Sequence, residues 1–218
     1  MSTILERQEQ KRQLIALSAE VLAEGLLTFS DRHSDVAAWI DRVLATPEDN
    51  LERFYCDLKA LQRGGRYIPL AQSGQYADKI SDLLLTLKQG SKDPRNGLQA
   101  LAEFFKSDQV IIERADDSCG EVGDVFRCDG VDLFVHFASQ YSEKAWISSL
   151  VLDILVEDEY CVRGKLIDEV SRFLAPNEIH LMHEQCKQKA EKEMDRYQRS
   201  HWLRLAGSLS KQLAEARA

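Results

Sequence analysis

Apolar residues recur along most of the chain at spacings of three and four residues, which is the pattern of amphipathic helices. Residues 11–27 carry a first apolar stripe that predicts a helix ending near Gly25, and residues 36–44 carry a second. Residues 110–112 and 131–135 are rich in β-branched and aromatic side chains, but both runs are short and fit the helical period. The pattern therefore predicts an all-α protein.

Helix-boundary residues divide the first half of the chain into separate helices. Thr46 followed by Pro47 predicts a helix start, with Thr as the N-cap and Pro at the first helical position. The Gly-Gly pair at 64–65 predicts the end of that helix, and Gly90 predicts the end of the next one. Asp93, which precedes a proline, predicts the start of a further helix.

The second half of the chain follows the same pattern. Ser142 predicts the start of a helix that buries Trp146, and a helix over residues 166–174 is predicted to close at Pro176. Residues 177–216 predict a last helix with few breaks. About nine helices joined by short links predict antiparallel helix pairs, stacked as a short α-solenoid or as an irregular bundle. No sequence period is clean enough to prove a repeat.

The composition is that of an ordinary folded domain. Of 218 residues, 44% are hydrophobic and 29% are charged, which excludes a disordered chain and allows a full core. Residues 1–10 are polar and mixed in charge, so we expect no secretory signal. The chain contains no run of about 18 uninterrupted apolar residues, so we expect no membrane span. A net charge of −8 argues against general binding of nucleic acid.

Charge is distributed unevenly between a body, residues 1–186, and a basic C-terminal helix, residues 187–218. The C-terminal helix holds eight basic and four acidic residues, a net charge of +4, so the body carries −12. We expect this helix to be a solvated amphipathic helix, which can be continuous with the last helix of the body. Its aromatic and basic residues can either pack on the body or bind nucleic acid by stacking and phosphate contacts. The nucleic-acid candidates are Arg196, Tyr197, Arg199, Trp202 and Arg204.

Five cysteines are spaced irregularly and include no Cys-x-x-Cys pair. An odd number of cysteines without an export signal is typical of reduced thiols in a cytoplasm rather than of a disulfide framework. The cysteines are Cys56, Cys119, Cys128, Cys161 and Cys186.

Two stretches of the chain resemble a known group of proteins. Residues 75–78 (Gln-Tyr-Ala-Asp) and 116–124 (Asp-Asp-Ser-Cys-Gly-Glu-Val-Gly-Asp) are similar to an uncharacterised bacterial family of all-helical repeat proteins, also found as the helical region beside SWIM-type zinc fingers. The resemblance extends over residues 35–190 and implies a helical-repeat fold with no assigned reaction. The finger's own Cys-x-Cys and Cys-x-His pairs are absent here, so no zinc or DNA role is implied.

The segment 116–124 is the most distinctive candidate for a binding site. Its carboxylates are ligand types that Ca²⁺ and Mg²⁺ prefer, but the spacing fails the EF-hand pattern, which requires Gly at the sixth position, where Glu121 stands. A structural turn, in which an acid or serine accepts backbone hydrogen bonds, explains the segment better. We predict no metal here and name as partner-binding residues Asp116, Asp117, Ser118, Glu121 and Asp124.

Other candidate chemistry is weak. His180, His183 and Cys186 share one helical face, but on a straight helix they spread over about 9 Å, too far to converge on one zinc ion. The sequence lacks a Gly-x-Ser-x-Gly elbow and a Gly-rich phosphate loop. We therefore predict no enzyme activity and no cofactor.

Three functions are compatible with these patterns. The first is a non-catalytic cytoplasmic helical-repeat protein, a monomer or homodimer without membrane contact, that serves as a protein-protein interaction module or adaptor. The second is a nucleic-acid-associated accessory protein that uses the basic C-terminal helix. The third is a divalent-metal-dependent enzyme that uses the acids of residues 116–124.

Overall fold

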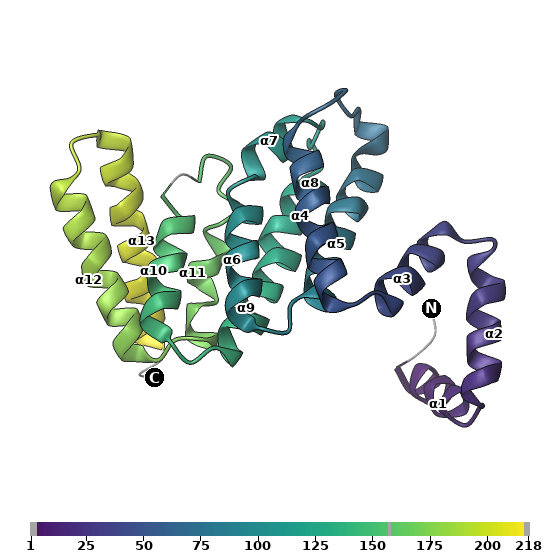
Figure 1. Cartoon of the computed structure of the whole chain (residues 1–218). Coiled ribbons are helices and arrows are strands. Elements are labelled where there is room, and N and C mark those ends of the chain that lie inside the picture. Colours follow the sequence, from purple (N-terminus) through teal and green to yellow (C-terminus); the bar gives the residue numbers. More distant parts are fainter. Residues whose placement is uncertain (1–3, 157, 216–218) are drawn as a thin grey trace. The chain divides into compact units, whose positions relative to one another are not determined.

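The computed structural model describes residues 4–156 and 158–215, which form helices joined by short links (Figure 1). These residues contain no β-strand, and a single isolated bridge joins Ile68 and Ala115. The all-α prediction is confirmed. The chain divides into two compact units, Met1–Thr46 and Pro47–Ala218, which are described separately below.

The first unit comprises α1 (Ile4–Ile15), α2 (Ala19–Ser30) and α3 (Ser34–Leu44), and α2 contacts α3. The predicted single helix over residues 11–27 is wrong because Ser18 interrupts it. The Ser18 hydroxyl accepts a hydrogen bond from the Val21 amide at 3.2 Å and so caps α2. No single described helix is long and apolar enough to cross a membrane, although α1 and α2, bent by 115°, meet the length and composition criteria as a pair.

The second unit contains the other helices, several of which stand side by side (Figure 1). Helix α4 contacts α5, α5 contacts α8, α6 contacts α9 and α10, and α10 contacts α12. This is a bundle-like, all-α packing, and the solenoid alternative stays a prediction. Its α-helices are α4 (Pro47–Gln62), α5 (Ser73–Gly90), α6 (Pro94–Phe105), α7 (Asp108–Glu113), α8 (Glu121–Asp124), α9 (Val131–Gln140), α10 (Lys144–Ile154), α11 (Lys165–Asp168), α12 (Pro176–Lys192) and α13 (Arg196–Glu215).

A chain of phenylalanine rings fills the centre of the second unit. Phe104 stacks on Phe126 with ring centroids 4.4 Å apart, and Phe134 meets both Phe105 and Phe173 edge to face. Such aromatic pairs add to the stabilisation that comes from burying their area. Trp146, predicted to be buried, is only partly buried at the edge of this core.

The helix count is higher than the predicted nine because two predicted helices are each divided in two, into α1 and α2 and into α12 and α13, and because the short α7 and α8 were not predicted. Residues 166–174 form the short α11 and the 3₁₀ turn η3 (Val170–Arg172), and Pro176 starts α12 instead of closing a helix. A proline at the first helical position loses no hydrogen bond.

The predicted continuous C-terminal helix is also wrong. The backbone leaves the helix at Glu193 (φ −79°, ψ 126°), and the Asp195 carboxylate caps α13 by accepting a hydrogen bond from the Gln198 amide at 2.8 Å. Helices α12 and α13 therefore form an antiparallel hairpin, with α13 contacting both α12 and α11.

A π-helical turn, η2 (Val125–Gly130), joins α8 to α9. Gly130 lies against the core here, since a Cβ atom at this position would stand 3.2 Å from the rings of Phe104 and Phe105. π-Helical turns are uncommon and occur frequently at functional sites. The side chains of Cys128 and Asp129 on this turn are exposed.

Candidate functional site

The segment 116–124 is a capped turn that starts α8. Asp117 accepts hydrogen bonds from the backbone amides of Val122, at 2.8 Å, and Gly123, at 2.9 Å. Gly120 precedes the helix with φ +76°, a conformation that glycine adopts without strain. The structural interpretation of the segment therefore accounts for Gly120 and for Asp117.

The remaining acids of this segment also have partners inside the protein. Asp116 accepts hydrogen bonds from the backbone and side chain of Ser118. Glu121 accepts one from the Ser73 hydroxyl at 2.9 Å, and Asp124 forms an ion pair with Arg127 at 2.9 Å. The segment holds Asp116, Asp117 and Ser118 in its own turn, whereas Glu121 and Asp124 lie on the exposed side of α8.

Replacing Asp117 with alanine is expected to lower the free energy of unfolding by about 1–2 kcal/mol, because two helix-start amides lose their acceptor. Chemical denaturation measures the change. The matched control is Asp124→Ala, which breaks an exposed ion pair and is expected to cost less than about 1 kcal/mol. Equal effects of the two variants would contradict the capping role of Asp117.

Two adjoining hollows run along α5 and the π-helical turn and share Ser81 and Asp129. Their volumes are about 340 Å³ beside α8 and about 310 Å³ beside α9. We call them together the acidic groove, because five acids line it and the only basic side chains in its lining are Lys88 and His136. The acids are Asp78, Glu121, Asp124, Asp129 and Asp132.

Only part of the acidic groove was predicted from the sequence. Glu121 and Asp124 were among the predicted binding residues, whereas Asp78, Asp129 and Asp132 were not. The available signal was local: Asp129 and Asp132 are three residues apart, the spacing of neighbours on a helix face. Asp129 lines the same hollow as Asp78 because α5 packs against η2, a contact that the sequence pattern does not specify.

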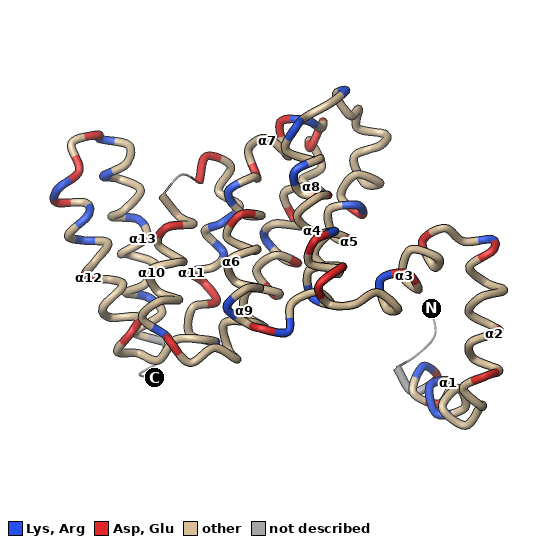
Figure 2. Tube along the Cα trace, in the orientation of Figure 1, with Lys and Arg blue, Asp and Glu red and all other residues tan. Residues whose placement is uncertain are grey.

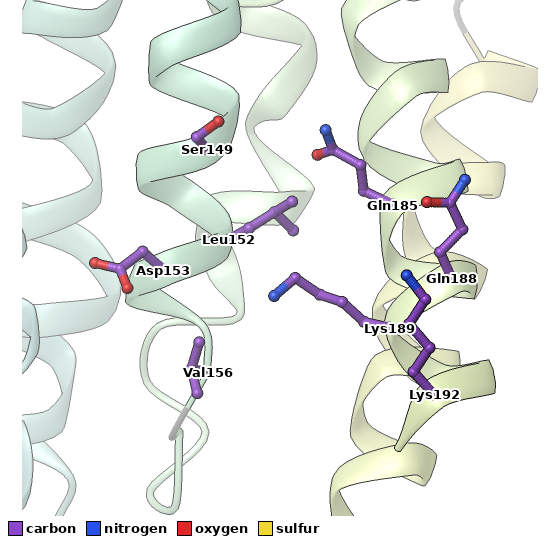
Figure 3. A pocket seen from close by; sticks show the side chains of 8 residues that line it. All are labelled: Ser149, Leu152, Asp153, Val156, Gln185, Gln188, Lys189 and Lys192. Carbon is purple, nitrogen blue, oxygen red and sulfur yellow. The ribbon is translucent and has the colours of Figure 1, made fainter.

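A third hollow, of about 410 Å³, lies between α10 and α12 (Figure 3). Gln185 and Lys189 extend from α12 toward α10, while Asp153 points away from α12 and pairs with Lys106. The Lys189 ammonium also lies 4.7 Å from the centre of the Trp202 ring. The polar groups of this hollow are thus partly engaged, and they include no nucleophile beside a base.

On α12, the ligand atoms of His180, His183 and Glu184 lie within 4.8 Å of one another, the one such group in the part of the chain described. Lys187 stands 3.5 Å from Glu184 and competes with a cation for that carboxylate. Cys186 is not a member of this group. It is buried, and burial raises the pKa of its thiol to about 11, so it is protonated at neutral pH.

The packing of α13 buries one of the five nucleic-acid candidates and leaves the other four exposed. Trp202 is only 4% exposed and Tyr197 is 85% exposed, so the tryptophan ring is not accessible for stacking on a base. Arg196, Arg199 and Arg204 are exposed, and Arg204 contacts His201 and Cys161. Figure 2 shows basic positions on α12 near its turn into α13, interrupted by acids at the turn itself. The nucleic-acid alternative stays a prediction.

Comparison with known proteins gives one match. A family model described as a family of unknown function (DUF6880) matches residues 7–218. No curated protein matches the chain significantly, and no solved structure does.

Proposed function

Because the chain belongs to the family of unknown function DUF6880, we propose its function from its surface: it is a non-catalytic protein-interaction module. The acidic groove is its binding site, and its ligand is a basic amphipathic segment of another protein. The resemblance of residues 35–190 to helical regions beside SWIM-type zinc fingers stays a prediction and agrees with an accessory role of this kind.

The combination of charge and apolar surface in the acidic groove carries this proposal. Four of the five carboxylates lie on the continuous stretch from α8 to α9, and α5 contributes Asp78 to the hollow beside α8. Apolar side chains, including Leu84, Leu133 and the 47% exposed Leu85, line the hollow beside α9 together with Asp129 and Asp132. An apolar surface with acids along its edge matches a helix that has one apolar face and lysines or arginines beside it. Opposite charge at the edges selects such a segment and speeds its association.

Exposed apolar residues in the first unit support a role in protein contacts. Helix α2 buries none of its residues, and the only buried side chain of α3 is Arg42. Large exposed apolar surfaces on a folded protein mark contact sites for other proteins. The exposed residues are Leu14, Ile15, Leu17, Val21, Leu26, Leu27, Phe29, Trp39, Val43 and Leu44.

The proposal is tested with two fluorescent helical peptides that share one apolar face and carry either lysine or glutamate on the polar face. We expect the lysine peptide to bind with a Kd of about 1–100 µM, more weakly at higher salt, and the glutamate peptide not to bind. Fluorescence anisotropy measures both.

Charge-reversal variants test whether the lysine peptide binds in the acidic groove. The double variant Asp78→Lys, Asp129→Lys is expected to weaken lysine-peptide binding by about tenfold or more, since each reversal replaces attraction by repulsion. The matched control, Glu191→Lys, changes an exposed acid on α12 and is expected to leave the affinity unchanged. Absence of lysine-peptide binding, or equal effects of the groove and control variants, would refute the proposal.

A further inference from the structure

A small basic pocket lies at the start of α5, apart from the acidic groove. We propose that this pocket binds the phosphate group of a small soluble molecule. Its volume is about 320 Å³, and it is formed by the link between α4 and α5, the first turns of α5 and the end of α7. It shares no lining residue with the acidic groove, so the two proposals stand independently.

Three cationic side chains line this pocket: Arg66, Lys79 and Arg114. None of the lining residues is acidic, and none of the three cations forms an ion pair with a residue that the structure describes. The protein has a net charge of −8, but three cations without ion-pair partners around one hollow create a local positive potential there. This potential attracts an anion. Gln72 and Gln75 add amide groups that donate hydrogen bonds.

Arg114 is held in a fixed position at the wall of this pocket. A Cβ atom on Gly65 would lie 2.5 Å from an Arg114 guanidinium nitrogen, so the side chain passes directly over the glycine backbone. The guanidinium carbon also lies 5.6 Å from the centre of the Tyr76 ring, within cation–π range. The Tyr76 hydroxyl in turn donates to the Ile111 carbonyl at 3.4 Å.

The backbone beside Arg114 is tied to the link between α4 and α5. The Ile68 amide donates to the Arg114 carbonyl at 2.9 Å, and the Asp116 amide donates to the Ile68 carbonyl at 2.9 Å. These bonds hold the two walls of the pocket together before a ligand arrives. Pre-organised walls reduce the entropy that binding costs.

The Arg114 guanidinium also has an unused donor. Its Nε atom is buried and has no hydrogen-bond partner among the described residues. A buried donor without an acceptor is unfavourable. Arg114 lines the pocket, and its guanidinium carries further N–H donors besides Nε that can bind an anion there. Guanidinium groups bind phosphate through paired hydrogen bonds, and the lysine adds a point charge. The volume fits a small phosphorylated molecule rather than a folded partner.

Isothermal titration calorimetry with inorganic pyrophosphate, at fixed ionic strength in chloride, tests the proposal. We expect saturable binding with a Kd below about 1 mM. Arg114→Gln is expected to weaken binding about tenfold or more, and Lys79→Gln to weaken it less, because only the guanidinium offers a paired contact. The control Lys92→Gln removes an exposed cation just past the other end of α5 and is expected to leave the Kd unchanged.

Gly65→Ala separates positioning from charge. The three atoms nearest to the added methyl group all belong to the Arg114 guanidinium, which has to shift, so we expect about tenfold weaker pyrophosphate binding with a smaller loss of stability than a core substitution causes. A phosphoserine peptide serves as a comparison. The proposal would be overturned if pyrophosphate did not bind saturably, or if Arg114→Gln and Lys92→Gln lowered its affinity equally. It would also be overturned if the phosphoserine peptide bound more tightly than pyrophosphate.

Discussion

Replacing Asp108 with alanine is expected to lower the free energy of unfolding by about 3–5 kcal/mol, because it leaves a buried arginine without its counter-ion. Asp108 and Arg163 form two parallel hydrogen bonds, Nε to Oδ2 at 2.9 Å and a terminal nitrogen to Oδ1 at 2.5 Å. Their side chains are 2% and 6% exposed. Arg163 also donates to the Ile154 carbonyl at 2.8 Å, so the pair links the start of α7 to the end of α10. Urea denaturation measures the change.

Two further variants show whether the loss of stability comes from leaving a buried charge without its partner. Asp153→Ala breaks the exposed pair with Lys106 and is expected to cost less than about 1 kcal/mol. The double variant Asp108→Leu, Arg163→Met removes both charges and is expected to be much closer to the wild type than Asp108→Ala, because no buried charge remains unpaired. A loss below about 1 kcal/mol for Asp108→Ala would show that the pair is not buried in solution.

The helices could be predicted where a local residue determines the boundary. Helix α4 begins at Pro47, and the chain turns at Gly64 with φ +73°, a left-handed conformation that suits glycine. Asp93 caps α6 by accepting a hydrogen bond from the Arg95 amide at 3.1 Å. Each of these signals acts within a few residues, so the sequence alone is sufficient to place them.

The errors in the helix boundaries also have local causes. Ser18 and Asp195 are N-cap residues that lie inside apolar patterns of continuous helical period. In both places the hydrophobic pattern suggested one helix, and the capping side chain was the signal against it. Pro176 was predicted to close a helix, whereas proline is equally suited to the first turn of the next one.

The candidate sites depend on contacts that no local pattern encodes. Asp108 and Arg163 are 55 residues apart, and Gly65 and Arg114 belong to different links. The segment 116–124 was correctly predicted to contain a turn, but the Asp78 carboxylate, which α5 brings to the same hollow, could be placed there only from the packing. Residues that cap helices could therefore be predicted from the sequence more readily than residues that come together to form a binding surface.

The contacts of Trp202 connect the hairpin of α12 and α13 to the core of the second unit. Its ring is buried among the core residues of the second unit, and the Lys189 ammonium lies 4.7 Å from the ring centre. The neighbouring His201 ring contacts the Leu155 carbonyl at 2.6 Å, which joins α13 to the end of α10. These contacts place Trp202 in the core and not on a nucleic-acid surface.

Trp202→Ala is therefore expected to lower the free energy of unfolding by about 3–5 kcal/mol, the cost of removing a large buried aromatic side chain. Tyr197→Ala, on the same helix but 85% exposed, is the matched control and is expected to change stability by less than about 0.5 kcal/mol. Chemical denaturation, followed by circular dichroism because the variant removes a tryptophan, measures both. If Trp202→Ala were as mild as Tyr197→Ala, the hairpin would not be docked, and its aromatic and basic residues would again be available to bind nucleic acid.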